Sequence, residues 1–158
     1  MRMKTLALAL CIIFAAVFPL APVVQAQDVA RTPADEAAIR ALIGRYVSAR
    51  DARDPKLIEP LFTSDADQYT TAGEWRRGRV QVVPGTLESS ARDPGKRSID
   101  IASLRFVTAD VAIIDGAYNV EGSPLKRWTT IVVKRDSGAW RISAIRNMVP
   151  TTQQPAPR

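Results

Sequence analysis

The sequence predicts an α+β domain in which helices gather on one face of a curved antiparallel sheet. Two observations support this fold class. Apolar residues in the first half of the chain recur at helical spacing, whereas the second half has runs rich in β-branched and aromatic residues, separated by tight turns. Helices followed by consecutive antiparallel strands form a layered α+β arrangement. The length of 158 residues suits one such domain.

The first helix is expected to begin at residues 32–35, which offer a capping hydroxyl, a proline at the first helical position and an acid in the first turn. It is expected to end near residues 51–54. Its apolar residues fall on a single stripe, formed by Ile39, Leu42, Ile43, Tyr46 and Val47. Arg40, Arg45 and Arg50 are expected to face away from this stripe.

A second, shorter helix is expected to open at Asp54 and Pro55, with an irregular or kinked turn at Pro60, where a helical hydrogen bond is missing. A first strand is predicted over residues 66–71. The glycine and proline residues of the following segment predict a short strand or loop that leads into a weak helix around residues 86–91.

The C-terminal part of the chain predicts four strands in sequence, joined by tight turns into a meander. The predicted strands are residues 98–107, 111–121, 125–135 and 139–148.

The N-terminal segment has the pattern of a secretory signal peptide. Arg2 and Lys4 precede an apolar run over residues 6–18, and small residues at 24–26 offer a cleavage site. We therefore expect a signal over residues 1–26, a lead-in over 27–32, the domain over 33–149 and a disordered tail over 150–158. The expected location is the periplasm or the extracellular medium, without membrane contact after cleavage, and an uncleaved anchor is the alternative.

Composition limits the chemistry that is expected. The chain has no histidine, and its single cysteine, Cys11, lies in the signal segment, so neither a metal nor thiol catalysis is expected. A general acid or base would have to be a carboxylate, tyrosine or lysine. Without a glycine-rich phosphate loop, no cofactor is expected. The net charge of +6 falls to +4 without the signal, and the arginines are scattered, so no nucleic-acid partner is expected and the arginines are read as solvated.

The segment from Arg127 to Arg146, RWTTIVVKRDSGAWRISAIR, resembles the C-terminal hairpin of SnoaL-like, nuclear-transport-factor-2-like domains. Residues 35–53, 55–67, 78–79 and 111–118 are similar to earlier segments of that family, so the resemblance covers about residues 33–149. It implies a cystatin-like cone: a strongly curved sheet wrapped around a long helix, with an apolar pocket open at one end. It also implies a homodimer formed through the sheet.

The family includes ketosteroid isomerase-like enzymes, dehydratases and polyketide cyclases, together with members that only bind or assemble. The isomerase type uses an aspartate base, a tyrosine and a protonated aspartic acid. The resemblance places Tyr46 on the tyrosine and Thr70 on the base, and residues 128–131 hold no carboxylate for the second acid. Because a threonine cannot abstract a proton at neutral pH, this chain lacks both the base and the second acid of the isomerase mechanism.

Three residues are candidates for acid or base catalysis. Asp67 and Tyr69 are two positions apart, so they share one face of a strand. Asp115 interrupts an apolar run and must therefore be solvated, paired or functional. The alternative is that Asp67 is a solvated turn acid, and that Asp115 forms a salt bridge or dimer contact with an arginine such as Arg127 or Arg146.

Six further residues are candidates for ligand binding, each with an alternative structural role: Tyr46, Trp75, Tyr118, Trp128, Arg146 and Asn147. The aromatic members either line the pocket or fill the core, and Trp75 either lids the open end or covers the core edge. Arg146 and Asn147 end the last strand, where they are suited to recognise a ligand carboxylate or carbonyl.

The expected function is therefore an exported, homodimeric protein that binds a small, partly apolar molecule. One alternative is an isomerase, dehydratase or cyclase that moves a proton on a carbonyl compound, with Asp67 or Asp115 as base and Tyr46 or Tyr69 as donor. Another is a structural or protein-interaction module.

Overall fold

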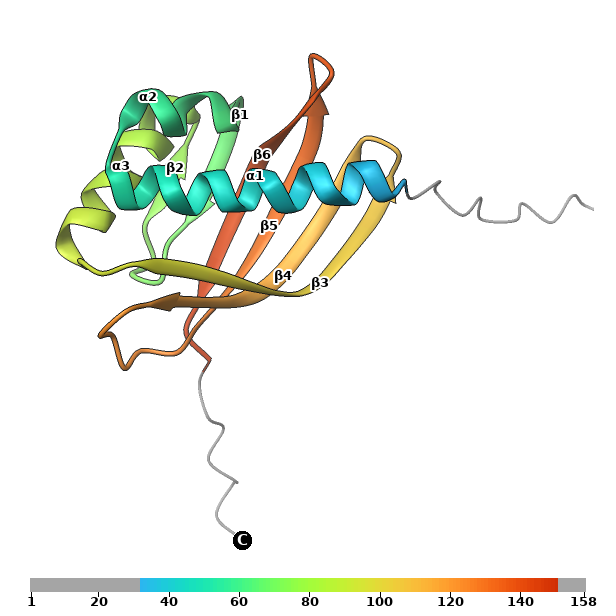
Figure 1. Ribbon diagram of the computed structural model, residues 1–158. Helices are drawn as coiled ribbons and strands as arrows, with labels where there is room; N and C mark the ends of the chain where they lie inside the picture. The colour runs from blue at the N-terminus through green and yellow to red at the C-terminus, as the bar shows by residue number, and fades with distance from the viewer. Residues whose placement is uncertain (1–31, 151–158) are drawn as a thin grey trace, which may run out of the picture.

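A long helix lies across one face of a six-stranded sheet in the computed structural model, which describes residues 32–150 (Figure 1). The expected signal over residues 1–26 and almost all of the expected tail lie outside the described residues. The elements in chain order are α1 (Pro33–Ala52), α2 (Pro55–Ile58), the 3₁₀ helix η1 (Glu59–Leu61), β1 (Phe62–Tyr69), β2 (Trp75–Arg77), α3 (Arg79–Arg92), β3 (Arg97–Thr108), β4 (Val111–Val120), β5 (Arg127–Asp136) and β6 (Ala139–Met148).

The strand order is β2-β1-β6-β5-β4-β3. The expected antiparallel meander is confirmed for β3 to β6. However, β1 runs parallel to β6, with Tyr69 opposite Arg146, so the sheet is mixed rather than antiparallel throughout. Tight turns in the sequence set the direction of neighbouring strands, but no turn connects β1 to β6. The sheet therefore joins β1, which precedes α3, to the last strand of the described chain.

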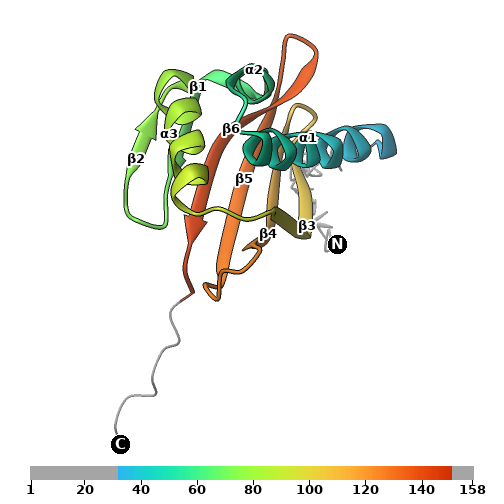
Figure 2. The same cartoon turned by 60° about the vertical axis from the view of Figure 1, so that its left-hand side comes forward.

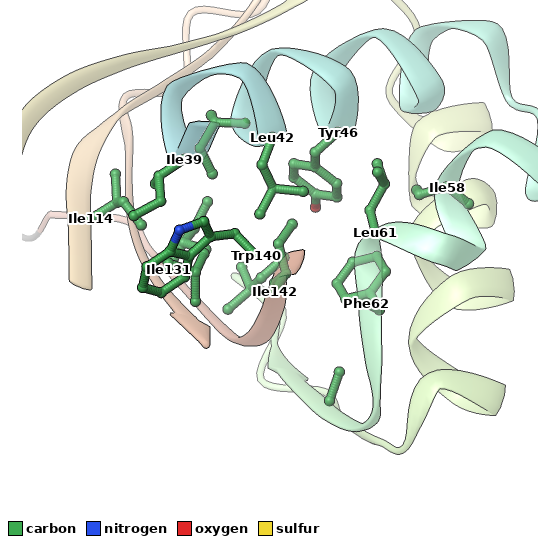
Figure 3. Close-up of a cluster of buried hydrophobic side chains, with 14 of the residues drawn as sticks. Ile39, Leu42, Tyr46, Ile58, Leu61, Phe62, Ile114, Ile131, Trp140 and Ile142 are labelled. Carbon is green, nitrogen blue, oxygen red and sulfur yellow. The ribbon is translucent and has the colours of Figure 1, made fainter. Parts of the chain in front are cut away.

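Helix α1 begins as expected, because the Thr32 hydroxyl accepts a hydrogen bond from the backbone N–H of Asp35 at 3.1 Å. Its apolar stripe packs on the inner face of the sheet (Figure 3). Tyr46 meets the Phe62 ring edge to face, with 5.7 Å between ring centroids. Trp140 is buried in the same core, as its alternation along the last strand indicates.

Two boundaries differ from the sequence expectation. Strand β1 begins at Phe62, directly after η1, rather than at residue 66. Helix α3 spans Arg79–Arg92, although Pro84 lies inside it, and not just residues 86–91. Packing of α3 against β1 and β2, on the same side of the sheet as α1, offsets the weak helical propensity of its first half (Figure 2). Gly78, with a φ of 72°, makes the turn from β2 into this helix.

Within residues 32–150, no helix is long and apolar enough to cross a membrane.

Candidate functional site

A cavity of about 190 Å³ opens beside the C-terminal end of α1. Its walls come from α1, α3, the loop between β1 and β2, strand β2, and the ends of strands β1, β4, β5 and β6. The lining residues are Arg50, Gln68, Thr70, Thr71, Ala72, Glu74, Arg76, Ser89, Arg92, Asp93, Tyr118, Arg127 and Asn147. The resemblance implies an apolar pocket, whereas the lining of this cavity is rich in arginine.

Arg50 forms the α1 side of the cavity and is only 5% exposed. Its Nε donates a hydrogen bond to Ser90 Oγ at 3.1 Å, and its Nη1 donates to the Tyr46 hydroxyl at 3.4 Å. The guanidinium lies 5.4 Å from the centroid of the Tyr118 ring and 5.6 Å from that of Tyr46, within the range of cation–π contacts. None of the ion pairs formed by residues 32–150 includes Arg50.

Arg50 stays charged despite its burial. Burial disfavours the charged guanidinium, but interaction with the phenol groups of Tyr46 and Tyr118 holds the pKa of Arg50 above its ordinary value. Burial raises the pKa of Tyr46, and the nearby Arg50 opposes this shift only in part. At neutral pH the pair is therefore a guanidinium cation beside a neutral phenol.

Arg76 is the second buried arginine of the cavity, at 3% exposure. Its Nη1 donates to Gln68 Oε1 at 2.9 Å, and its Nη2 donates to Ser89 Oγ at 2.9 Å and to Glu74 Oε2 at 2.5 Å. Its buried Nε has no hydrogen-bond partner among residues 32–150. Gly85 on α3 makes space for this side chain, since a Cβ atom there would lie 2.7 Å from Arg76 Cδ.

The remaining charges at the cavity are paired. Arg127 Nη2 lies 2.7 Å from Asp93 Oδ2, and Arg92, which is exposed, pairs with Glu88. The hydrogen bond from Arg76 lowers the pKa of Glu74, so this carboxylate is ionised at neutral pH. Four arginines line the cavity. Glu74, Asp93 and, outside the lining, Glu88 pair with three of them, so Arg50 alone in this lining has no acidic partner among residues 32–150.

Only some of the predicted ligand-binding residues are at this cavity. Tyr118 and Asn147 line it, and Tyr46 lies behind it, in contact with Arg50. Thr70, the residue that the resemblance aligns with the isomerase base, also lines the cavity, and its hydroxyl accepts a hydrogen bond from the Glu74 N–H at 3.1 Å. The cavity wall thus has a hydroxyl where the isomerase type has a carboxylate.

A separate group of predicted residues meets on the other face of the sheet, because Asp67 and Tyr69 alternate with the buried Gln68. Arg146 Nη2 donates to Asp67 Oδ2 at 2.8 Å, and Trp75 Nε1 donates to the same oxygen at 3.1 Å. The Tyr69 and Trp75 rings are 5.5 Å apart. Asp67 is therefore held by an arginine and an indole, away from the cavity.

Asp115 is also outside the cavity lining, and the prediction that its partner would be Arg127 or Arg146 is wrong. Thr130 Oγ1 donates to Asp115 Oδ1 at 2.6 Å, and Ser103 Oγ donates to Oδ2 at 3.2 Å. The two arginines instead pair with Asp93 and Asp67. Trp128 is on the same outer face, opposite Ala117 and Met148.

Sequence reasoning missed the two buried arginines of the cavity lining. Arg50 was expected to face away from the apolar stripe, but it lies four residues after Tyr46 and so continues the buried face of α1. That spacing is the signal which identifies it. Arg76 follows the strand alternation, because it lies between the exposed Trp75 and Arg77, but a strand of three residues is too short to reveal this.

Among residues 32–150, no three or more of the histidine, cysteine, aspartate and glutamate side chains gather in a way that could hold a metal ion.

No protein-family model and no curated protein sequence matches this chain. Solved structures do. A domain of unknown function with a cystatin-like fold from Nostoc punctiforme superposes with a TM-score of 0.67 at 21% identity, over 78% of this chain and 82% of its own. Two nuclear-transport-factor-2-like proteins of unknown function also superpose. The one from Pseudomonas putida has a TM-score of 0.64 at 18% identity, over 78% of this chain and 92% of its own. The one from Shewanella oneidensis has a TM-score of 0.63 at 12% identity, over 72% and 98%. The expected fold is therefore confirmed: this chain has the cystatin-like, nuclear-transport-factor-2-like fold.

Proposed function

We propose that this protein is an exported binding protein for a small molecule, which enters the cavity beside the end of α1. The observation that carries the proposal is the open cavity itself, because side chains from two helices and five strands converge on space that the described part of the chain does not fill. An assembly module would fill this space with its own side chains. Export rests on the signal-like pattern of residues 1–26.

The size of the cavity limits the ligand. Its volume of about 190 Å³ is below the roughly 300–1,000 Å³ that is typical of sites for drug-sized molecules. A steroid-sized substrate is thus too large for it, whereas a small metabolite fits. The Tyr118 ring offers an apolar surface, and Thr70, Thr71 and Asn147 offer hydroxyl and amide groups.

The geometry favours binding over proton transfer. A carboxylate base of the isomerase type needs a raised pKa and must face the ligand. Glu74 and Asp93 reach the cavity, but each is paired with an arginine. Asp67 and Asp115 lie on the other face of the sheet.

We also propose that two copies associate through the sheet face opposite α1. On this face Ile113, Val132 and Ala144 lie side by side in register, and none of the described helices covers them (Figure 1). The partly exposed Met148 and Trp128 extend the same surface. An uncovered apolar sheet face of this kind is typical of a protein–protein contact.

Native mass spectrometry of the protein purified from the periplasm tests the proposed function. We expect a species that retains, or takes up from a metabolite extract, a small molecule. Ala72→Trp, at the mouth of the cavity, is expected to abolish this added mass, whereas Ala139→Trp, in the distant β5–β6 hairpin, is expected to retain it. If the unaltered protein has no added mass, either as purified or after exposure to the metabolite extract, the proposal is contradicted.

A further inference from the structure

The charges around the cavity are not balanced. Arg76 and Arg127 have carboxylate partners in Glu74 and Asp93, and Arg92 pairs with Glu88 outside the lining. The exception is Arg50, which is the most enclosed charge on the helix side of the cavity and has only hydroxyl and aromatic partners. A buried charge without a counter-charge is costly, so such a site is poised to accept an anion.

The neighbours of Arg50 accept hydrogen bonds from only some of its N–H groups. A guanidinium has five N–H donors, and those to Ser90 and Tyr46 use two of them. Even with a hydrogen bond to the Tyr118 hydroxyl, two remain. Two N–H groups on one guanidinium match the two oxygens of a carboxylate.

Resting on the proposed function, we infer that the ligand is a small monocarboxylic acid, whose carboxylate pairs with Arg50. One negative charge neutralises the one arginine of the cavity lining that has no acidic partner among residues 32–150. A dianion such as phosphate would meet Glu74 and Asp93 in the same cavity, and these carboxylates repel a second negative charge. The cavity volume restricts the acid to a short or single-ring body.

Calorimetric titration at pH 7 with matched pairs of probes tests the inference: butyrate against butyramide, and benzoate against benzamide. Each pair has the same shape and differs in charge. We expect at least one acid to bind about tenfold or more tightly than its amide, and inorganic phosphate to bind more weakly than that acid.

Variants of Arg50 link the binding to this side chain. Arg50→Met is expected to weaken binding of the acid by about 10- to 100-fold, the range for a lost charge-assisted pair. Arg50→Lys keeps the charge but loses the forked geometry, so an intermediate loss is expected. Arg45→Met, on the exposed side of the same helix, is the control and should bind as the unaltered protein does. Thermal unfolding of each variant separates loss of binding from loss of fold.

The possible results distinguish this inference from the proposed function. If the amides bind as well as the acids, or if phosphate binds best, the cavity takes a ligand but the monocarboxylate is wrong. If Arg50→Met binds the acid with unchanged affinity, Arg50 is not its partner. If no probe binds and the protein carries no added mass, both proposals fail. The comparison of acid with amide on the unaltered protein holds even if Arg50→Met does not fold.

Discussion

Burial of a guanidinium has different consequences at the two enclosed arginines of the cavity. Arg76 is fixed by hydrogen bonds to Gln68, Ser89 and Glu74, so its charge is already paired within the protein. Arg50 is fixed by hydrogen bonds to neutral groups, so its charge remains available to pair with an anion. Arginine therefore has a structural role at position 76 and is proposed to bind the ligand at position 50.

Two helical glycines offer a test of how firmly Arg76 is held. Gly85→Ala is expected to lower the free energy of unfolding by about 1 kcal/mol or more, because the added methyl group collides with the hydrogen-bonded Arg76 side chain. Gly44→Ala, at an exposed position of α1, adds a methyl group that meets no atom within 4 Å, and it is expected to raise the free energy of unfolding by about 0.5–1 kcal/mol. Urea denaturation measures both. Equal stabilisation by the two substitutions would mean that Arg76 moves aside freely.

At the scale of elements, Asp35 attaches the start of α1 to the β5–β6 hairpin. Its Oδ1 accepts hydrogen bonds from Trp140 Nε1 at 3.0 Å and from Arg135 Nη2 at 2.5 Å, and Thr32 donates to its Oδ2 at 2.7 Å. The hydrogen bonds from Thr32, Trp140 and Arg135 lower the pKa of Asp35 to about 2. The attachment of α1 to this hairpin therefore depends on whether the Asp35 carboxyl group is ionised.

The pH dependence of stability follows from the sign of that shift. Because the pKa of Asp35 is lower in the folded protein than its ordinary 3.8, its contribution is complete above that value and is lost as the pH falls towards 2. Asp35→Asn is expected to lower the unfolding midpoint at pH 7, with a difference from the unaltered protein that shrinks between pH 4 and pH 2. Thermal unfolding across this range measures it. A difference that stays constant with pH would contradict the role of Asp35.

The sequence predicted well the features that depend on neighbouring residues, and it predicted poorly those that depend on residues far apart in the chain. The cap of α1 and the three hairpin turns depend on neighbouring residues, and the structure has them where the sequence predicts them. The parallel β1–β6 pair and the full length of α3 depend on partners far along the chain, and neither was predicted. The cavity depends on both local and distant interactions. Tyr118 and Asn147 were therefore identified as candidates, whereas Arg50 and Arg76 were not.

At the scale of the whole molecule, the proposed dimer predicts the effect of a charge on the outer sheet face. Val132→Glu is expected to convert a dimer into a monomer, because a carboxylate would be buried against the apolar residues of a second copy. Val80→Glu is the control, since Val80 is 84% exposed on α3, away from this face. Light scattering during size-exclusion chromatography measures the mass. A dimer that tolerates Val132→Glu would place the contact elsewhere.

The position of β6 also determines when the protein can fold. This strand is the last described element to be synthesised, but it lies in the middle of the sheet, between β1 and β5. Until it emerges, β1 and β2 have no connection to the meander, and the wall that bears Asn147 does not exist. Pairing across such a long loop is slow, because the loop must close before its contacts form. A chain still under synthesis therefore lacks part of the sheet and of the cavity wall. The proposed export through a membrane channel requires such an incompletely folded chain.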